Sequence, residues 1–207
     1  MDLLLTQLAD TSLLEWIAVI LAIAYVLLAA LESSWCWLCA FISTAIYTFL
    51  FWQVTLPFQS ALNGFYMVMA VYGYYQWKKG SKTEAKTGIT RSSFHFHLTL
   101  VPCLLFVAYW LSQAAEGQFN SDFLWLDASI HLLSMATTFM VAHKILENWI
   151  YWFFINIASA YLYAQSGLVL TAILFVGYVG FSLFGYWQWR QQWNNRHASG
   201  FNSQPAN

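Results

Sequence analysis

The chain has 207 residues, of which 60% are hydrophobic, 20% aromatic and only 8% charged, and its formal net charge is −1. A soluble domain carries about 25% charged residues, so this composition excludes an ordinary water-exposed surface. We therefore predict an all-α integral membrane protein that lies in the lipid bilayer and has no nucleic acid partner. The first ten residues lack the basic region and the cleavage site of a signal peptide.

Seven apolar segments follow one another, each close to the roughly 20 residues that a membrane-spanning helix needs. We predict helices over Leu13–Leu31, Trp35–Leu56, Gln59–Trp77, His97–Ala115, Phe123–Ala142, Asn148–Gln165 and Leu168–Trp189. Pro57 ends the second helix, and we expect the polar residues after Arg190 to be disordered. The predicted units are a first three-helix bundle, a basic loop, a connector helix, a second three-helix bundle and a polar tail, with bounds 1–77, 78–96, 97–116, 117–190 and 191–207.

The basic residues support a count of seven helices. With seven crossings all eight basic residues fall on one side of the membrane, whereas one helix more or fewer would scatter them. The positive-inside rule places that side in the cytoplasm. We therefore expect a multi-pass protein of the bacterial inner membrane, with its N-terminus outside and its C-terminus in the cytoplasm. The residues are Lys78, Lys79, Lys82, Lys86, Arg91, Lys144, Arg190 and Arg196.

The sequence also contains an internal repeat. YGYYQWK at 72–78 resembles FGYWQWR at 184–190, and ESSWCW at 32–37 resembles ENWIYW at 147–152. This alignment pairs Glu32 with Glu147 and Trp37 with Trp152. Helices one to three then match helices five to seven in the same orientation, with helix four as a connector, which is a 3+1+3 parallel repeat.

The sixth predicted helix carries a stripe of aromatic and polar residues on one face. Residues three or four positions apart lie on the same side of a helix. An amide such as Asn156 is costly in an apolar helix unless a neighbouring helix or a solute meets its hydrogen bonds. Asn156 aligns with the apolar Phe41 in the first repeat, which favours binding of a flat, polar and possibly cationic ring over helix packing. The stripe consists of Trp149, Trp152, Asn156, Ser159 and Tyr163.

Two ionisable residues share a face of the fifth helix. Asp127 and His131 are four residues apart and are interpreted either as a proton relay or ligand contact, or as a packed pair near the interface. Glu147 follows Lys144 by three residues, which predicts an ion pair on the helix surface.

No catalytic or metal-binding motif is present. The chain has no Ser–His–Asp order, HExxH motif or phosphate loop, and the CWLC stretch at 36–39 lies inside an apolar run. His95 and His97 are two residues apart and would not share a helical face, so they predict no metal site. We expect neither an enzyme nor a cofactor.

The stretch KILENWIYWFFIN at 144–156, the preceding LDASIHLLSMATTFMVAH, and YGYYQW at 72–77 resemble the PnuC family of vitamin transporters. The most specific element is ENW-x-x-W-x-x-x-N, followed by Gly167 and a last helix that ends in G-Y/W-x-x-W. The resemblance implies a 3+1+3 helix arrangement related to the SWEET sugar transporters, and homotrimers. It also implies that Trp152 and Asn156 bind substrate, with Trp149 and Asp127 at recurrent family positions. Asn63, where glutamine is common in the family, and Trp37 of the WCW stretch complete the candidate site.

The family resemblance implies facilitated uptake of nicotinamide riboside, with thiamine a close second and riboflavin carried by some relatives. A cytoplasmic kinase would then trap the vitamin by phosphorylation. Three alternatives remain open from the residues: a proton-coupled transporter that uses Asp127 and His131, a SWEET-like sugar carrier, and a membrane enzyme or purely structural bundle.

Overall fold

The protein is described by a computed structural model over residues 12–53, 57–80, 88–116 and 123–202. Within these ranges it forms seven α-helices, which confirms the predicted all-α class. Six of them have bounds close to the predicted ones. Pro57 is the first residue of its helix, and the predicted end of the helix before it, at Leu56, lies outside the described residues. They are α2 (Leu13–Ala30), α3 (Cys36–Gln53), α4 (Pro57–Gly80), α5 (Phe94–Ala115), α6 (Leu124–Ala142), α7 (Asn148–Gln165) and α8 (Val169–Asn202).

Four of the described helices are long and apolar enough to cross a membrane: α2, α3 with the preceding Trp35, α5 and α6. The other three contain tryptophans, tyrosines and amides, which lower their mean hydropathy. Their outer faces are nevertheless apolar, and Val68, Phe154 and Val176 are each more than 60% exposed. Such large exposed apolar side chains suit contact with lipid, as expected for a multi-pass membrane protein.

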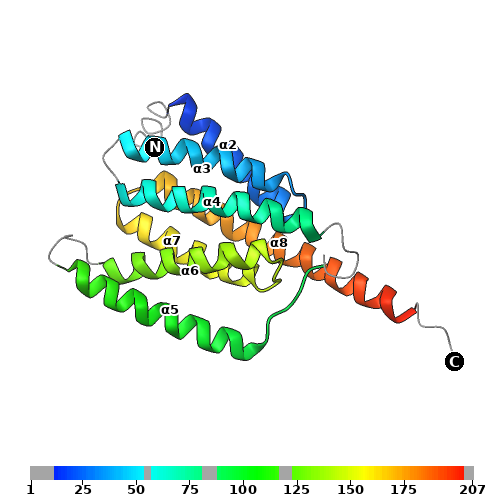
Figure 1. Cartoon of the computed structure of the whole chain (residues 1–207). Coiled ribbons are helices and arrows are strands. Elements are labelled where there is room, and N and C mark those ends of the chain that lie inside the picture. The colour runs from blue at the N-terminus through cyan, green and yellow to red at the C-terminus, as the bar shows by residue number, and fades with distance from the viewer. Residues whose placement is uncertain (1–11, 54–56, 81–87, 117–122, 203–207) are drawn as a thin grey trace.

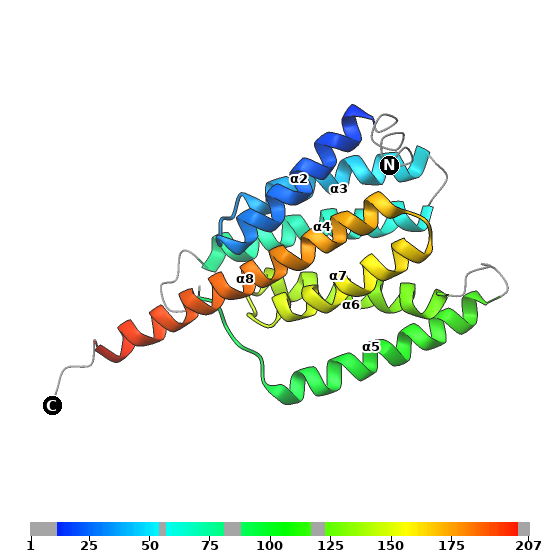
Figure 2. The ribbon, with the colours of Figure 1, turned by 180° about the vertical axis from the view of Figure 1, so that it is seen from behind.

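The helices form two groups with one helix at the edge. Helix α3 packs against α2 and α4, and α7 packs against α6 and α8. The groups meet where α4 contacts α6 and where α2 contacts α8. Helix α5 packs against α6 and lies at the periphery of the bundle (Figures 1 and 2). We call α2–α4 the first half and α6–α8 the second half.

The two halves are related by a fixed offset along the chain. Glu32 and Lys144, 112 residues apart, are the two non-glycine residues in the described chain with left-handed backbones, at φ 53° and 52°. Each follows the end of a first helix, and each turn is closed by the same bonds, Ser33 N–H to Leu28 O and Ile145 N–H to Met140 O. Glu32 therefore corresponds to Lys144, and the predicted pairing of Glu32 with Glu147 is wrong.

The same offset appears in a tryptophan–glycine contact inside each half. The Trp37 ring lies over Gly73, and the Trp149 ring lies over Gly185, so closely that a Cβ atom on either glycine would collide with the indole. Trp37 therefore corresponds to Trp149 and not to Trp152, as the sequence alignment had it. With this register Asn156 corresponds to Thr44 rather than to Phe41.

We expect Gly185→Ala to destabilise the protein, because the methyl group must displace the buried Trp149 ring. Overpacking of this kind costs about 1–3 kcal/mol, which outweighs the gain of up to about 1 kcal/mol from alanine's helix propensity. The measurement is the melting temperature of purified protein in detergent. Gly180→Ala in the same helix is the control, because nothing lies within 4 Å of its added Cβ. Equal melting temperatures for the two variants would contradict the packing argument.

Helix α8 does not end at the predicted Trp189 but continues to Asn202, beyond the rest of the bundle (Figures 1 and 2). The predicted disordered tail therefore begins as helix, and residues 203–207 lie outside the described ranges. Trp193 packs against the core cluster, and the Arg91 guanidinium lies 5.6 Å from the centre of its ring. Arg196, two turns beyond Trp189, reaches Glu32 with an Nη2–Oε1 distance of 3.1 Å.

Candidate functional site

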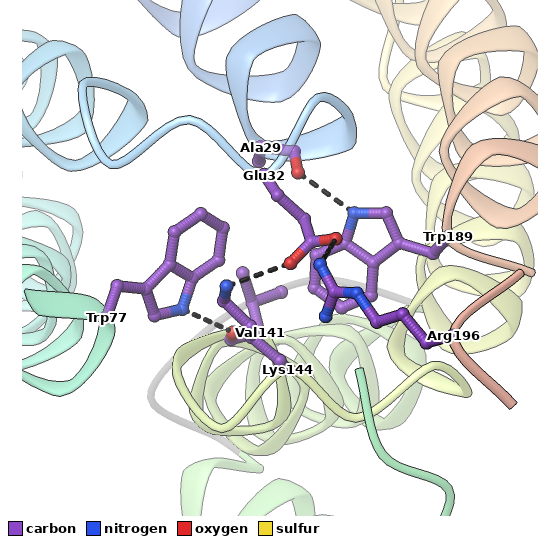
Figure 3. A network of polar contacts seen from close by, with 7 residues as sticks. All are labelled: Ala29, Glu32, Trp77, Val141, Lys144, Trp189 and Arg196. Carbon is purple, nitrogen blue, oxygen red and sulfur yellow. Dashed lines mark hydrogen bonds and ion pairs between the residues drawn. The ribbon is translucent and has the colours of Figure 1, made fainter. Parts of the chain in front are cut away.

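One end of the bundle is closed by reciprocal contacts between the halves (Figure 3). The indole N–H of Trp77 donates to the Val141 carbonyl at 3.2 Å, and that of Trp189 donates to the Ala29 carbonyl at 3.0 Å. Helix α4 of the first half thus bonds to the last turn of α6, and helix α8 of the second half bonds to the last turn of α2. We call this end, which also carries Lys78 and Arg190, the basic end.

A buried carboxylate stands at the centre of the basic end. Glu32 lies between two cations, with Lys144 Nζ at 2.8 Å from Oε2 and Arg196 Nη2 at 3.1 Å from Oε1 (Figure 3). Lys144 also lies 4.7 Å from the centre of the Trp77 ring, which adds a cation–π contact. Glu32 and Lys144 belong to different halves, so this ion pair joins the halves at their equivalent turns.

Four tryptophan rings run through this end in one continuous series. Trp37 meets Trp77 edge-on at 5.5 Å, Trp77 meets Trp189 at 6.3 Å, and Trp189 meets Trp149 edge-on at 5.6 Å. Trp37 and Trp149 are 2% and 3% exposed, and within the described chain their indole N–H groups have no hydrogen-bond partner. Their described contacts place these two candidate binding residues in the cores of the two halves.

The predicted ion pair between Lys144 and Glu147 does not form. Glu147 bonds instead to Arg91, with an Nε–Oε1 distance of 3.0 Å, and accepts the main-chain N–H of Ser92 at 3.1 Å. The left-handed turn at Lys144 directs that side chain to the other half. These contacts anchor the segment before α5 to the start of α7 at the basic end. Lys82 and Lys86 lie outside the described residues.

The predicted stripe is the inward face of α7. Trp149, Asn156 and Ser159 are buried, and Trp152 and Tyr163 are half-buried, whereas Ile150, Phe154, Ile157 and Tyr161 on the other faces are exposed. Trp152 packs against the core cluster, one turn before Asn156. Tyr163 stacks on Phe175 of α8 with ring centres 5.2 Å apart. The spacing in the sequence therefore placed these five residues correctly on one face of the helix.

Asn156 makes its described hydrogen bond to the neighbouring helix. Its Nδ2 donates to Ser182 Oγ of α8 at 3.1 Å, and the Ser182 hydroxyl donates to the Tyr178 carbonyl at 2.8 Å. Asn156 is 5% exposed and Ser182 is 2% exposed. Ser182 was not predicted, because a single serine in an apolar helix gives no periodic signal.

The remaining candidates make their described hydrogen bonds within their own helices and not to Asn156. Asp127 and His131 do share a face of α6, with His131 Nδ1 at 3.3 Å from Asp127 Oδ1 and at 2.7 Å from the Asp127 carbonyl oxygen. They belong to the first turns of α6, at the opposite end from Val141. Asn63 donates to the Gln59 carbonyl of its own helix at 2.9 Å. No group of three metal-ligating side chains occurs among the described residues.

Comparison with known proteins places this arrangement in a family. The family model described as nicotinamide mononucleotide transporter matches residues 12–191. The chain is 22% identical over 206 residues to the nicotinamide riboside transporter PnuC of Escherichia coli, covering 87% of this chain and 86% of that protein. It is 26% identical over 132 residues to the protein of the same name from Haemophilus influenzae, covering 60% and 55%.

A solved structure shares the fold. The crystal structure of the vitamin B3 transporter PnuC superposes with a TM-score of 0.68 at 18% identity, over 92% of this chain and 86% of that one. The long family match, the apolar helices and the shared fold agree with one another. The chain therefore belongs to the nicotinamide mononucleotide transporter family and is a membrane transporter rather than an enzyme.

Proposed function

We propose that the protein mediates facilitated uptake of a small aromatic cationic vitamin, with nicotinamide riboside as the first candidate and thiamine as the second. The observation that carries the proposal is the buried Asn156 amide. It is hydrogen-bonded to Ser182 and lies on the same face of α7 as Trp152. The equivalent positions of Asn156 and Trp152 in the first half are Thr44 and Ala40, so the shared helix framework does not require either side chain. The names of the relatives support the choice of nicotinamide riboside.

In the proposed mechanism the vitamin ring stacks on Trp152, and Asn156 binds the polar edge of the ring. Aromatic faces attract flat and cationic rings, and an amide supplies both a donor and an acceptor. The two halves form a 3+1+3 parallel repeat of the SWEET type with α5 as connector, and they rock around this site. Tyr163 and Ser159, on the same face of α7, extend the binding surface.

The basic end is the proposed cytoplasmic gate, which the reciprocal Trp77 and Trp189 bonds hold closed. The positive-inside rule orients this end toward the cytoplasm and the N-terminus outside. A cytoplasmic kinase then traps the imported vitamin. Three copies of the chain form the proposed assembly in the bacterial inner membrane.

Uptake into proteoliposomes without an ion gradient tests the proposal. We expect purified protein to equilibrate labelled nicotinamide riboside across the membrane, with unlabelled nicotinamide riboside as the strongest competitor, thiamine next, and glucose without effect. Strong competition by glucose would favour a sugar carrier. Protein-free liposomes supply the background, and absence of any accumulation above it would reject the function.

The contact between His131 and Asp127 favours one second candidate, a proton-coupled transporter. An inward proton gradient imposed on the same proteoliposomes separates the two. Accumulation above the external concentration, lost on Asp127→Asn, would establish coupling. Simple equilibration, unchanged by the gradient, is the outcome expected for facilitated diffusion.

A further inference from the structure

The hydrogen bonds of Ser182 determine which way the Asn156 amide faces. A hydroxyl group has one hydrogen to donate, and Ser182 gives it to the Tyr178 carbonyl at 2.8 Å. The serine oxygen therefore meets Asn156 as an acceptor. Only the NH2 side of the amide makes a favourable contact with it, which explains why Nδ2 lies 3.1 Å from Ser182 Oγ. The amide oxygen of Asn156 is left on the side away from Ser182.

The first half shows that this contact is not needed to pack the two helices. By the offset that relates Glu32 to Lys144, Asn156 and Ser182 correspond to Thr44 and Ala70. Thr44 bonds to the Ala40 carbonyl of its own helix at 2.8 Å, and Ala70 has no side-chain donor or acceptor. Helices α3 and α4 nevertheless pack as closely together as α7 and α8 do. The Asn156–Ser182 bond is therefore specific to the half that carries the proposed binding motif.

We propose that Ser182 is a positioning residue that holds the Asn156 amide with its oxygen toward the substrate, so that the transporter selects aromatic vitamins with a hydrogen-bond donor on the ring edge. This inference rests on the proposed function. A carboxamide or an aromatic amino group donates to the amide oxygen. A carboxylate at the same position only accepts hydrogen bonds, so it cannot donate to the amide oxygen and is repelled by it.

Competition against labelled nicotinamide riboside by its acid analogue, nicotinic acid riboside, tests the selection. We expect the wild-type protein to prefer the amide by at least about 100-fold, because a site built around a hydrogen bond strongly rejects an analogue that lacks the donor. In Ser182→Ala the Asn156 amide turns freely and offers its NH2 group to the carboxylate. The preference should then fall by about tenfold or more, through weaker binding of the amide and stronger binding of the acid.

Two further variants separate positioning from a merely structural role. Ser182→Thr keeps the hydroxyl and should restore the wild-type preference. Ser43→Ala removes an equally buried serine, which donates to the Ala18 carbonyl in the first half, and should leave the preference unchanged. A folded Ser182→Ala protein with the wild-type preference would overturn the inference, as would a loss of preference in Ser43→Ala.

The role of Ser182 can be tested even if nicotinamide riboside is not the substrate. Should the wild-type protein transport thiamine instead, the matched pair is thiamine and its analogue with a hydrogen atom in place of the ring amino group. Selection for the amino compound that weakens in Ser182→Ala supports the role of Ser182 although the proposed substrate is wrong. Equal transport of both compounds overturns the role of Ser182.

Discussion

Asn156→Ala is expected to abolish uptake of the vitamin while the protein still folds. The substitution removes the buried amide one turn after Trp152 on the inward face of α7, which is the group proposed to bind the polar edge of the ring. Removing one partner of a buried hydrogen bond costs about 1–3 kcal/mol, so transport at a given substrate concentration falls by up to about 100-fold. Initial uptake rates in proteoliposomes, compared over a range of substrate concentrations, measure the effect.

The structural cost of Asn156→Ala is small by comparison. Ser182 keeps its bond to the Tyr178 carbonyl, so one net hydrogen bond of about 1 kcal/mol is lost. Thr44→Ala is the matched control, because Thr44 is the equivalent residue of the first half and loses a polar group of its own. We expect normal elution from a sizing column for both variants and normal uptake for Thr44→Ala alone. Wild-type uptake by Asn156→Ala would remove the basis of the proposed site.

Reversing the charge of Glu32 at the basic end is expected to lower both the yield of folded protein and uptake. Glu32 is 8% exposed in its side chain and holds both Lys144 and Arg196. Glu32→Lys places three cations together, and an uncompensated buried charge costs about 3–5 kcal/mol. We expect the basic end to lose its closed arrangement, with a large drop in the yield of folded protein and in uptake.

The double variant Glu32→Lys with Lys144→Glu restores an ion pair between the same two turns. It should recover a substantial part of both folded yield and uptake, because one opposite-charge pair again joins the two turns. Lys79→Glu, an exposed residue at the end of α4, controls for charge reversal in general and should have little effect. If the double variant is no better than Glu32→Lys, the pairing of these two residues does not hold the end closed.

The sequence was sufficient for the number and order of the helices and for placing the stripe on one face of α7. Apolar segments of spanning length have ends marked by polar residues, and a three-to-four-residue spacing shows one face directly. The register of the repeat was harder, because Trp149 and Trp152 offer two alignments for Trp37 that differ by one helical turn. The left-handed turns at Glu32 and Lys144 and the close contact of each indole with its glycine select between them.

Contacts between distant parts of the chain account for the other differences. Lys144 has an acidic neighbour three residues away, yet a left-handed turn carries it to Glu32, and backbone φ is not visible in a side-chain pattern. The polar residues after Arg190 resemble a tail, but Trp193 and Arg196 continue the face of Trp189 and find partners on the bundle. The role of Ser182 can be recognised only in the structure, where its hydroxyl oxygen accepts a hydrogen bond from Asn156.

The opposite charges at the two left-handed turns also decide which halves can be joined. Glu32 and Lys144 occupy equivalent positions and face each other across the junction at 2.8 Å. Two copies of the first half joined in the same way would bring two carboxylates together, and two copies of the second half would bring together two ammonium groups. Only unlike halves form the pair. Attraction between these unlike charges therefore favours pairing of the first half with the second, and repulsion between like charges disfavours pairing of identical halves.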